Sequence, residues 1–184
     1  MLFIWLHRGE EPLGLTRSGR DLGSFQGSKV AIIGIGNLLL GDEGVGVHVA
    51  QRLAEMIHSD DIQVIDAGTS PDIFGLVDAQ KVVIIDAARA GGVPGTIYRF
   101  ELGDLNVNSE QPLSLHELSL LDGLRVLSFL NRRPESVVII GIEPSTVDFR
   151  LELSPQVERK LPEVMRLIIS EIGGITEQTM EVIR

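Results

Sequence analysis

The chain of 184 residues contains no cysteine and carries a formal net charge of −10. Without thiols it cannot form disulfides, thiolate nucleophiles or cysteine-ligated zinc and iron–sulfur centres. The excess of negative charge disfavours binding to nucleic acid or to anionic membranes. No apolar run reaches the roughly 18 residues of a membrane span, so we expect a soluble, cytoplasmic protein that binds neither nucleic acid nor membrane.

The domain organisation follows from where hydrophobic periodicity begins and ends. Residues 1–28 lack a clear period and are rich in Gly, Ser, Arg and acidic residues, so we interpret them as a weakly ordered N-terminal appendage. A single α/β domain is expected over residues 29–172, a length that suits one hydrophobic core. Residues 173–184 are expected to form a C-terminal tail.

The first half of this domain alternates between strand and helix patterns. The almost continuous apolar run over residues 29–36 predicts a strand that is buried on both faces. A helix over residues 43–58, a strand over 63–66, a short helix over 72–78 and a strand over 81–86 are expected to follow.

The second half begins with the turn residues Gly91–Gly95, after which residues 96–100 are expected to form an antiparallel edge strand. Residues 102–113 look like a loop. A helix over 115–130, a strand over 137–142 and a helix over 154–172 complete the series, and Ser154–Pro155 is a common helix start. The alternation predicts a three-layer α/β/α sandwich: a mostly parallel twisted sheet with helices on both faces and one antiparallel edge strand.

The loop after the first strand does not fit a nucleotide-binding loop. Gly34 and Gly36 supply the first two glycines of a dinucleotide fingerprint, but Leu39 stands where the third is needed. Asp42 and Glu43 then occupy the helix start at which a pyrophosphate would bind, and their negative charge opposes one. NAD or FAD binding is therefore disfavoured.

Acidic residues follow nearly every predicted strand, at the edge where function collects in open α/β sheets. Asp42 is expected to cap backbone N–H groups of the first helix, and Glu43 is either a second cap or a ligand. Asp66 could bind loop amides. Asp86 follows four apolar residues directly, so its carboxylate should be partly buried, which is costly unless the group is paired or bound to metal. Glu143 follows the last strand.

Among the histidines, His116 is the best candidate for chemistry. It opens a predicted helix beside a long loop, where a neutral imidazole gains nothing from the helix dipole, whereas His48 is expected at the surface. Glu43, Asp86 and His116 together would form an oxygen, oxygen and nitrogen set. Such a set suits a first-row divalent ion, or general acid–base catalysis on a water molecule, and the residues alone leave both open.

The ordered motifs resemble those of the hydrogenase maturation proteases. The segment Gly34–Gly46, which reads G-I-G-N-L-L-L-G-D-E-G-V-G, is similar to the family's opening signature. The segments Ile65–Thr69, Ile84–Ala87, Ser114–Leu118 and Gly141–Pro144 resemble its later motifs, in the same order. The resemblance covers the chain from about Lys29 to Ile172.

The resemblance implies an endopeptidase that removes the C-terminal extension of a nickel–iron hydrogenase large-subunit precursor after nickel insertion. Its metal-contacting and catalytic residues fall at Glu43, Asp86 and His116, which would recognise the substrate-borne nickel transiently. No permanent cofactor is expected. Asn37 would hydrogen-bond across the first turn, and Asp66 would order the neighbouring loops.

Other functions remain open from the sequence. The same residues could belong to a non-proteolytic nickel-binding assembly factor for hydrogenase, which would bind the precursor without cutting it. An unrelated protease of similar fold would cut without nickel. A flavodoxin-like cofactor carrier is disfavoured, because the chain has one Trp and one Tyr with which to sandwich a flavin.

Overall fold

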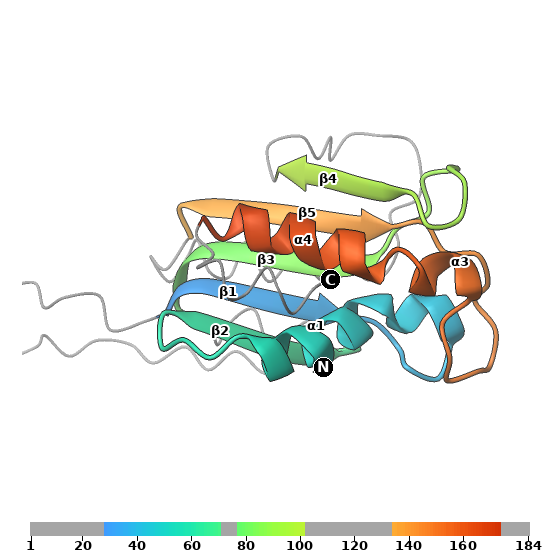
Figure 1. Ribbon diagram of the computed structural model, residues 1–184, viewed down its shortest axis with the longest axis horizontal. Coiled ribbons are helices and arrows are strands. Elements are labelled where there is room, and N and C mark those ends of the chain that lie inside the picture. The colour runs from blue at the N-terminus through green and yellow to red at the C-terminus, as the bar shows by residue number, and fades with distance from the viewer. Residues whose placement is uncertain (1–27, 71–76, 102–133, 174–184) are drawn as a thin grey trace, which may run out of the picture.

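The computed structural model describes residues 28–70, 77–101 and 134–173, which form one sheet and the helices packed on it (Figure 1). The strand predictions are confirmed, with ends that shift by one or two residues, as element boundaries commonly do. The elements in chain order are β1 (Ser28–Ile35), the 3-10 helix η1 (Gly41–Gly44), α1 (Val45–Met56), β2 (Ile62–Gly68), β3 (Ala79–Ala87), β4 (Ile97–Glu101), β5 (Ser136–Ile142), α3 (Pro155–Glu158) and α4 (Leu161–Glu171).

The sheet has the strand order β2-β1-β3-β5-β4. Strands β2, β1, β3 and β5 run parallel, whereas β4 runs antiparallel beside β5 and forms the edge. The mostly parallel sheet with one antiparallel edge strand is therefore confirmed. Because β1, β3 and β5 run the same way, the loops that follow them meet at a single edge of the sheet, at the arrowheads in Figure 1.

The central strands supply two hydrophobic cores by alternation. In β1, Ile32 joins the cluster that includes the helices and Ile33 joins the cluster on the opposite face; in β3, Ile85 and Ile84 divide in the same way. All of these side chains are fully buried. Full burial of such a side chain stabilises the fold by about 1.5–3 kcal/mol, which explains why these strands are apolar at nearly every position.

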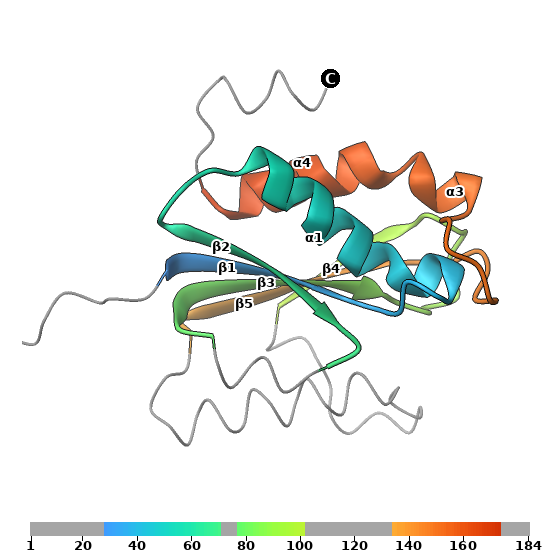
Figure 2. The same cartoon turned by 90° about the horizontal axis from the view of Figure 1, so that it is seen from below.

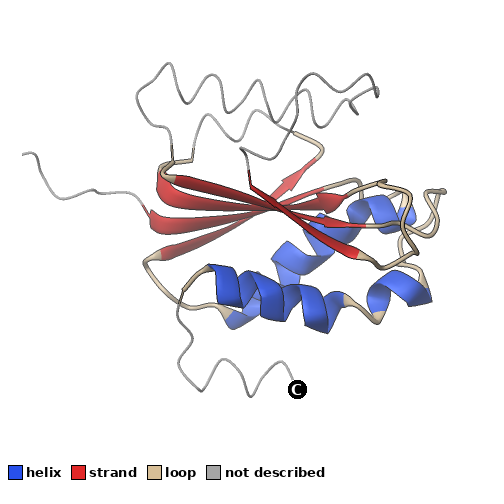
Figure 3. Ribbon diagram, turned by 90° about the horizontal axis from the view of Figure 1, so that it is seen from above, coloured by secondary structure: helices blue, strands red, loops and turns tan. Residues whose placement is uncertain are grey.

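The described helices α1, α3 and α4 all lie on one face of the sheet (Figures 2 and 3). The helices predicted for residues 115–130 and for most of 72–78 lie outside the described residues. The residues of the second core cluster, which includes Ile33 and Ile84, are buried on the opposite face of the sheet. None of the helices in the described ranges has the length and hydropathy that a membrane span requires.

The single helix expected over residues 154–172 is wrong, because the structure has two. Ser154 caps α3, its hydroxyl accepting a hydrogen bond from the Val157 amide at 3.3 Å, and Pro155 begins the helix as predicted. Pro162 explains the break before α4. It has no N–H to donate to Glu158, so it is tolerated in the first turn of a new helix and not in the interior of a longer one.

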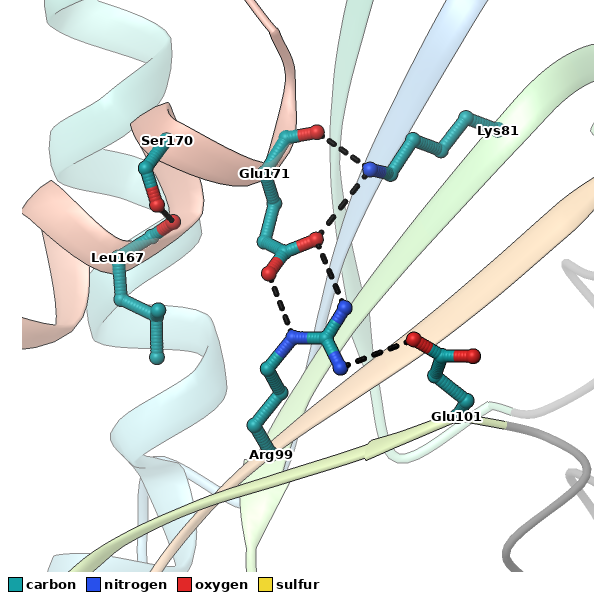
Figure 4. Close-up of polar contacts among 6 residues, drawn as sticks. All are labelled: Lys81, Arg99, Glu101, Leu167, Ser170 and Glu171. Atoms are coloured by element: carbon teal, nitrogen blue, oxygen red, sulfur yellow. Dashed lines mark hydrogen bonds and ion pairs between the residues drawn. The ribbon is translucent and has the colours of Figure 1, made fainter.

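The end of α4 is fixed to the sheet by Glu171 (Figure 4). Its carboxylate binds Arg99 of β4 at 2.6 Å and Lys81 of β3 at 3.3 Å, and its backbone carbonyl also accepts a hydrogen bond from Lys81. The Arg99 guanidinium lowers the pKa of the Glu171 carboxyl. Partial burial acts in the opposite direction but is outweighed, and Lys81 lowers the pKa further. These contacts lie toward the amino-terminal end of β3, away from the loop edge.

Candidate functional site

Glu43 lies in η1 and not in the predicted first turn of an α-helix. The 3-10 turn Gly41–Gly44 precedes α1, whose N-cap is Gly44, so the helix expected from residue 43 begins at Val45. The side chain of Glu43 is half-buried. Its backbone packs so closely on the end of β1 that a Cβ placed on Gly36 would lie 2.0 Å from the Glu43 carbonyl oxygen.

The start of α1 also contacts the strand that carries Asp86. A Cβ on Gly46 would lie 2.2 Å from the carbonyl oxygen of Ile85 and 2.3 Å from that of Ile35, so the helix sits directly on the ends of β3 and β1. Turn η1 contacts β3 as well. The structure therefore brings the elements bearing Glu43 and Asp86 together, although the two residues are far apart in the sequence.

Asp86 is the penultimate residue of β3 and pairs in register with Gly141 of β5. Its side chain is half-buried, which confirms the expectation from the apolar run before it. One carboxylate oxygen, Oδ1, accepts a hydrogen bond from the Ala87 amide at 2.7 Å. Asp86 is therefore hydrogen-bonded to the backbone of the last residue of its own strand.

Asp42 has a structural role that differs from the one expected. Neither η1 nor α1 has a side-chain cap, so the prediction that Asp42 caps its own helix is wrong. The carboxylate is fully buried and accepts hydrogen bonds from the amides of Ser145 at 2.8 Å, Thr146 at 3.0 Å and Ser154 at 2.6 Å. These donors belong to the loop between β5 and α3, about a hundred residues away in the sequence, so local patterns could not reveal them.

Glu143 is a second buried carboxylate at this edge. It accepts hydrogen bonds from the Tyr98 hydroxyl at 2.7 Å and from the amides of Ala90 at 2.9 Å and Gly92 at 3.2 Å. Burial opposes ionisation, but these donors together lower the pKa of the Glu143 carboxyl, and the same carboxylate raises the pKa of Tyr98. Sequence reasoning placed Glu143 at a strand end but missed its partners, which come from the loop after β3 and from β4.

The smaller predictions for neighbouring polar residues are confirmed. Asn37 bonds across its turn, its Oδ1 accepting from the Leu39 amide at 3.0 Å. Asp66 accepts from the Gly68 amide at 3.0 Å and from the Gln51 side chain at 3.0 Å, so it links the end of β2 to α1. Both residues therefore order the backbone beside the candidate site.

The histidines divide between the described and undescribed parts of the chain. His116 lies outside the described residues. His48 is half-buried and its Nε2 is buried with no hydrogen-bond partner among the described residues, so the expected surface position is wrong. Within residues 28–70, 77–101 and 134–173, no group of three His, Asp or Glu side chains is arranged to hold a metal ion. Of the predicted set, the described structure thus positions Glu43 and Asp86.

The chain is similar in sequence to known proteins over most of the described domain. The family model described as hydrogenase maturation protease matches residues 47–171, a range that starts just after Glu43 and includes Asp86 and His116. A putative hydrogenase maturation protease from Methanocaldococcus jannaschii is 32% identical over 149 residues, covering 78% of this chain and 96% of the relative.

Solved structures share the fold. The hydrogenase maturating endopeptidase HybD from Escherichia coli superposes with a TM-score of 0.71 at 24% identity, covering 78% of this chain and 91% of that one. The hydrogenase maturation protease HybD from Thermococcus kodakarensis gives a TM-score of 0.64 at 27% identity, covering 78% and 98%.

Proposed function

The chain belongs to the hydrogenase maturation protease family, and from that premise we propose that it removes the C-terminal extension of a nickel–iron hydrogenase large-subunit precursor after nickel insertion. Glu43, Asp86 and His116 recognise the nickel carried by the substrate. The observation that carries this assignment is the packing of η1 and the start of α1 on the end of β3, which puts Glu43 and Asp86 at one edge of the sheet.

The chemistry of the three side chains suits this role. Two carboxylates and an imidazole are acceptable ligands for a divalent first-row ion such as nickel. Nickel bound by the enzyme and the precursor together would hold the scissile peptide bond in place and polarise its carbonyl. The chain has no cysteine to act as nucleophile, and we propose that a water molecule attacks, with one carboxylate or His116 as general base.

Exposed apolar side chains beside Glu43 support a protein substrate. Leu39 is 49% exposed, and Phe149 and Leu151 in the loop between β5 and α3 are 84% and 59% exposed. The two segments are hydrogen-bonded, since the Arg150 amide donates to the Leu39 carbonyl at 3.0 Å. Grouped apolar side chains at a surface commonly mark contact with another protein, and we propose that the precursor docks here.

Mass spectrometry of the precursor tests the function. The nickel-loaded precursor is expected to lose a single C-terminal peptide with the wild-type protein, and the nickel-free precursor is expected to stay whole. Glu43→Gln, Asp86→Asn and His116→Ala should each lower the cleavage rate at least ~100-fold, because each removes a ligand or base. Asp61→Asn is the matched control, since Asp61 is an exposed acid that pairs with Lys29 at the start of β1, at the end of the sheet opposite the loop edge, and it should cleave at the wild-type rate.

The alternatives give different spectra. If the wild-type protein binds the loaded precursor and leaves it whole, the non-proteolytic assembly factor is the better description. Equal cleavage with and without nickel would remove the metal-sensing role from the three residues. Full activity in any of the three variants would remove that residue from the site.

A further inference from the structure

The loop between β5 and α3 is bonded to η1, which carries Glu43, and to the turn that follows Asp86 and the end of β3. On one side the loop contacts η1, because three of its amides donate hydrogen bonds to the Asp42 carboxylate. Two backbone bonds add to these: the Asp42 amide donates to the Thr146 carbonyl at 3.2 Å, and the Gly41 amide donates to the Arg150 carbonyl at 2.8 Å. Because Asp42 is adjacent to Glu43, these bonds hold the backbone of Glu43 in place.

On the other side the same loop holds the segment that follows Asp86. The side chain of Glu143 accepts from Ala90, Gly92 and Tyr98. Its backbone carbonyl accepts from Gly95 at 2.8 Å and its amide donates to Thr96 at 2.9 Å. Glu143 is thus bonded along the whole turn between β3 and β4.

Both anchors are buried carboxylates, and each accepts three hydrogen bonds from N–H or O–H donors. Asp42 is fully buried and Glu143 is 7% exposed. A buried carboxylate is tolerated when several N–H or O–H groups satisfy it, and such a group then fixes every donor around it, because losing it would leave those donors unpaired. Glu143 and Ser145 are two residues apart, so the two anchors meet in one short stretch of chain.

We propose that Asp42 and Glu143 are positioning residues that set the spacing between Glu43 and Asp86 through residues 143–154. The proposal rests on the function given above, since the spacing matters only if Glu43 and Asp86 bind the substrate metal. Metal sites lose affinity when the residues behind their ligands are altered, typically by 10–100-fold, because ligand positions must be held within about 0.5 Å. Neither positioning residue contacts the substrate.

The test measures how strongly the protein prefers the nickel-loaded precursor. Binding constants are determined for the loaded and the nickel-free precursor, and their ratio is the nickel preference. Asp42→Asn and Glu143→Gln keep the side-chain shape but place an NH2 group against N–H or O–H donors, and each should lower the preference about tenfold. Glu171→Gln is the matched control, because this carboxylate also has several partners but lies away from the loop edge, and it should keep the wild-type preference.

A double-mutant comparison separates positioning from general damage. Glu43→Gln should lower the preference without abolishing it, since two proposed ligands remain, and Asp42→Asn added to it should cause no further loss, because Asp42 acts through Glu43. Damage to the precursor-binding surface would weaken binding of both precursor forms and leave their ratio unchanged, which would overturn the proposal.

The failures are distinguishable. If Glu43→Gln keeps the wild-type nickel preference, the proposed function of that residue is wrong. If Glu43→Gln lowers the preference while Asp42→Asn and Glu143→Gln retain it, the function stands and the positioning role is refuted. Should the two carboxylate variants fail to fold, Tyr98→Phe decides, since it removes one donor from Glu143: a several-fold loss of preference supports the proposal and a wild-type ratio overturns it.

Discussion

Gly36 shows how a single residue determines where Glu43 lies. Its φ of +144° is strained for residues with a side chain, and a Cβ there would lie 2.0 Å from the Glu43 carbonyl oxygen. The glycine therefore has two structural roles: it allows the chain to turn after β1, and it leaves room for the backbone of η1. The sequence motif indicated the turn, but only the fold shows which backbone atom occupies the space.

Gly36→Ala should separate these effects. We expect a loss of about 3 kcal/mol in the free energy of unfolding, since both backbone strain and a clash with backbone atoms must be relieved, and a lower cleavage rate as Glu43 moves. The matched control is Gly91→Ala, with φ +81° and no atom within 4 Å of the added Cβ, which should lose about 1 kcal/mol of stability from backbone strain alone. Urea denaturation measures both, and equal losses would show that the contact with Glu43 is unimportant.

At the scale of elements, local sequence patterns predicted where α3 begins but not where α4 begins or how its end is held. Ser154 and Pro155 marked the start of α3, whereas the break at Pro162 was missed because the apolar positions continue through it. Glu171 is unfavourable to its helix on electrostatic grounds, since a negative charge lies at the negative end of the helix dipole. Its ion pairs with Arg99 and Lys81 offset this cost (Figure 4).

The pH dependence of stability should report on Glu171. Its folded-state pKa is lowered, so its contribution is fully present above the ordinary Glu pKa of about 4.3 and is lost as the pH falls through the lower folded value. At pH 7, Glu171→Gln should lower the free energy of unfolding by about 1 kcal/mol. The difference from wild type should shrink as the solution is acidified.

A matched control for this measurement is Glu163→Gln. Glu163 is 59% exposed and pairs with Lys160, the N-cap residue of α4, so its removal should change stability little at any pH. Denaturant titrations at several pH values measure both variants. If the free energies of unfolding of Glu171→Gln and wild type differ by the same amount from neutral to acidic pH, the ion pairs of Glu171 do not contribute to stability.

At the scale of the whole molecule, the described residues form a sheet with two cores and one loop edge. The M. jannaschii relative is covered over 96% of its own length by 78% of this chain, so the remainder of the chain has no counterpart there. We propose that the protease domain is the expected segment 29–172, extended by one residue to Ser28 where β1 begins, and that the residues on either side of it are accessory.

Truncation tests this domain assignment. A chain that starts at Ser28, the first residue of β1, and ends at Gly173 should cleave the nickel-loaded precursor with a kcat/KM within about twofold of the full chain, because both cores are retained. The removal of residues 174–184 alone serves as the control for the C-terminal side. A loss of tenfold or more on removing residues 1–27 would assign that segment a part in catalysis or substrate binding.

The ends of the strands that lead to Glu43 and Asp86 in the candidate site were predictable because their signals are local. An apolar run followed by an acid identifies a strand end, as at Asp86, and an ordered set of such motifs is specific enough to indicate a family. Neither pattern requires knowledge of distant contacts. The sequence also showed that the parallel strands would bring these acids to one edge.

The sequence by itself determined the strands, the antiparallel edge and the family, since these depend on hydrophobic period and on short motifs. Only the tertiary structure decided the roles of Asp42 and Glu143. The Asp42 carboxylate finds its donors 103 to 112 residues away, and those of Glu143 lie 45 to 53 residues away. A buried acid must be satisfied by whatever donors the fold brings to it, and no pattern around the acid itself records which residues those are.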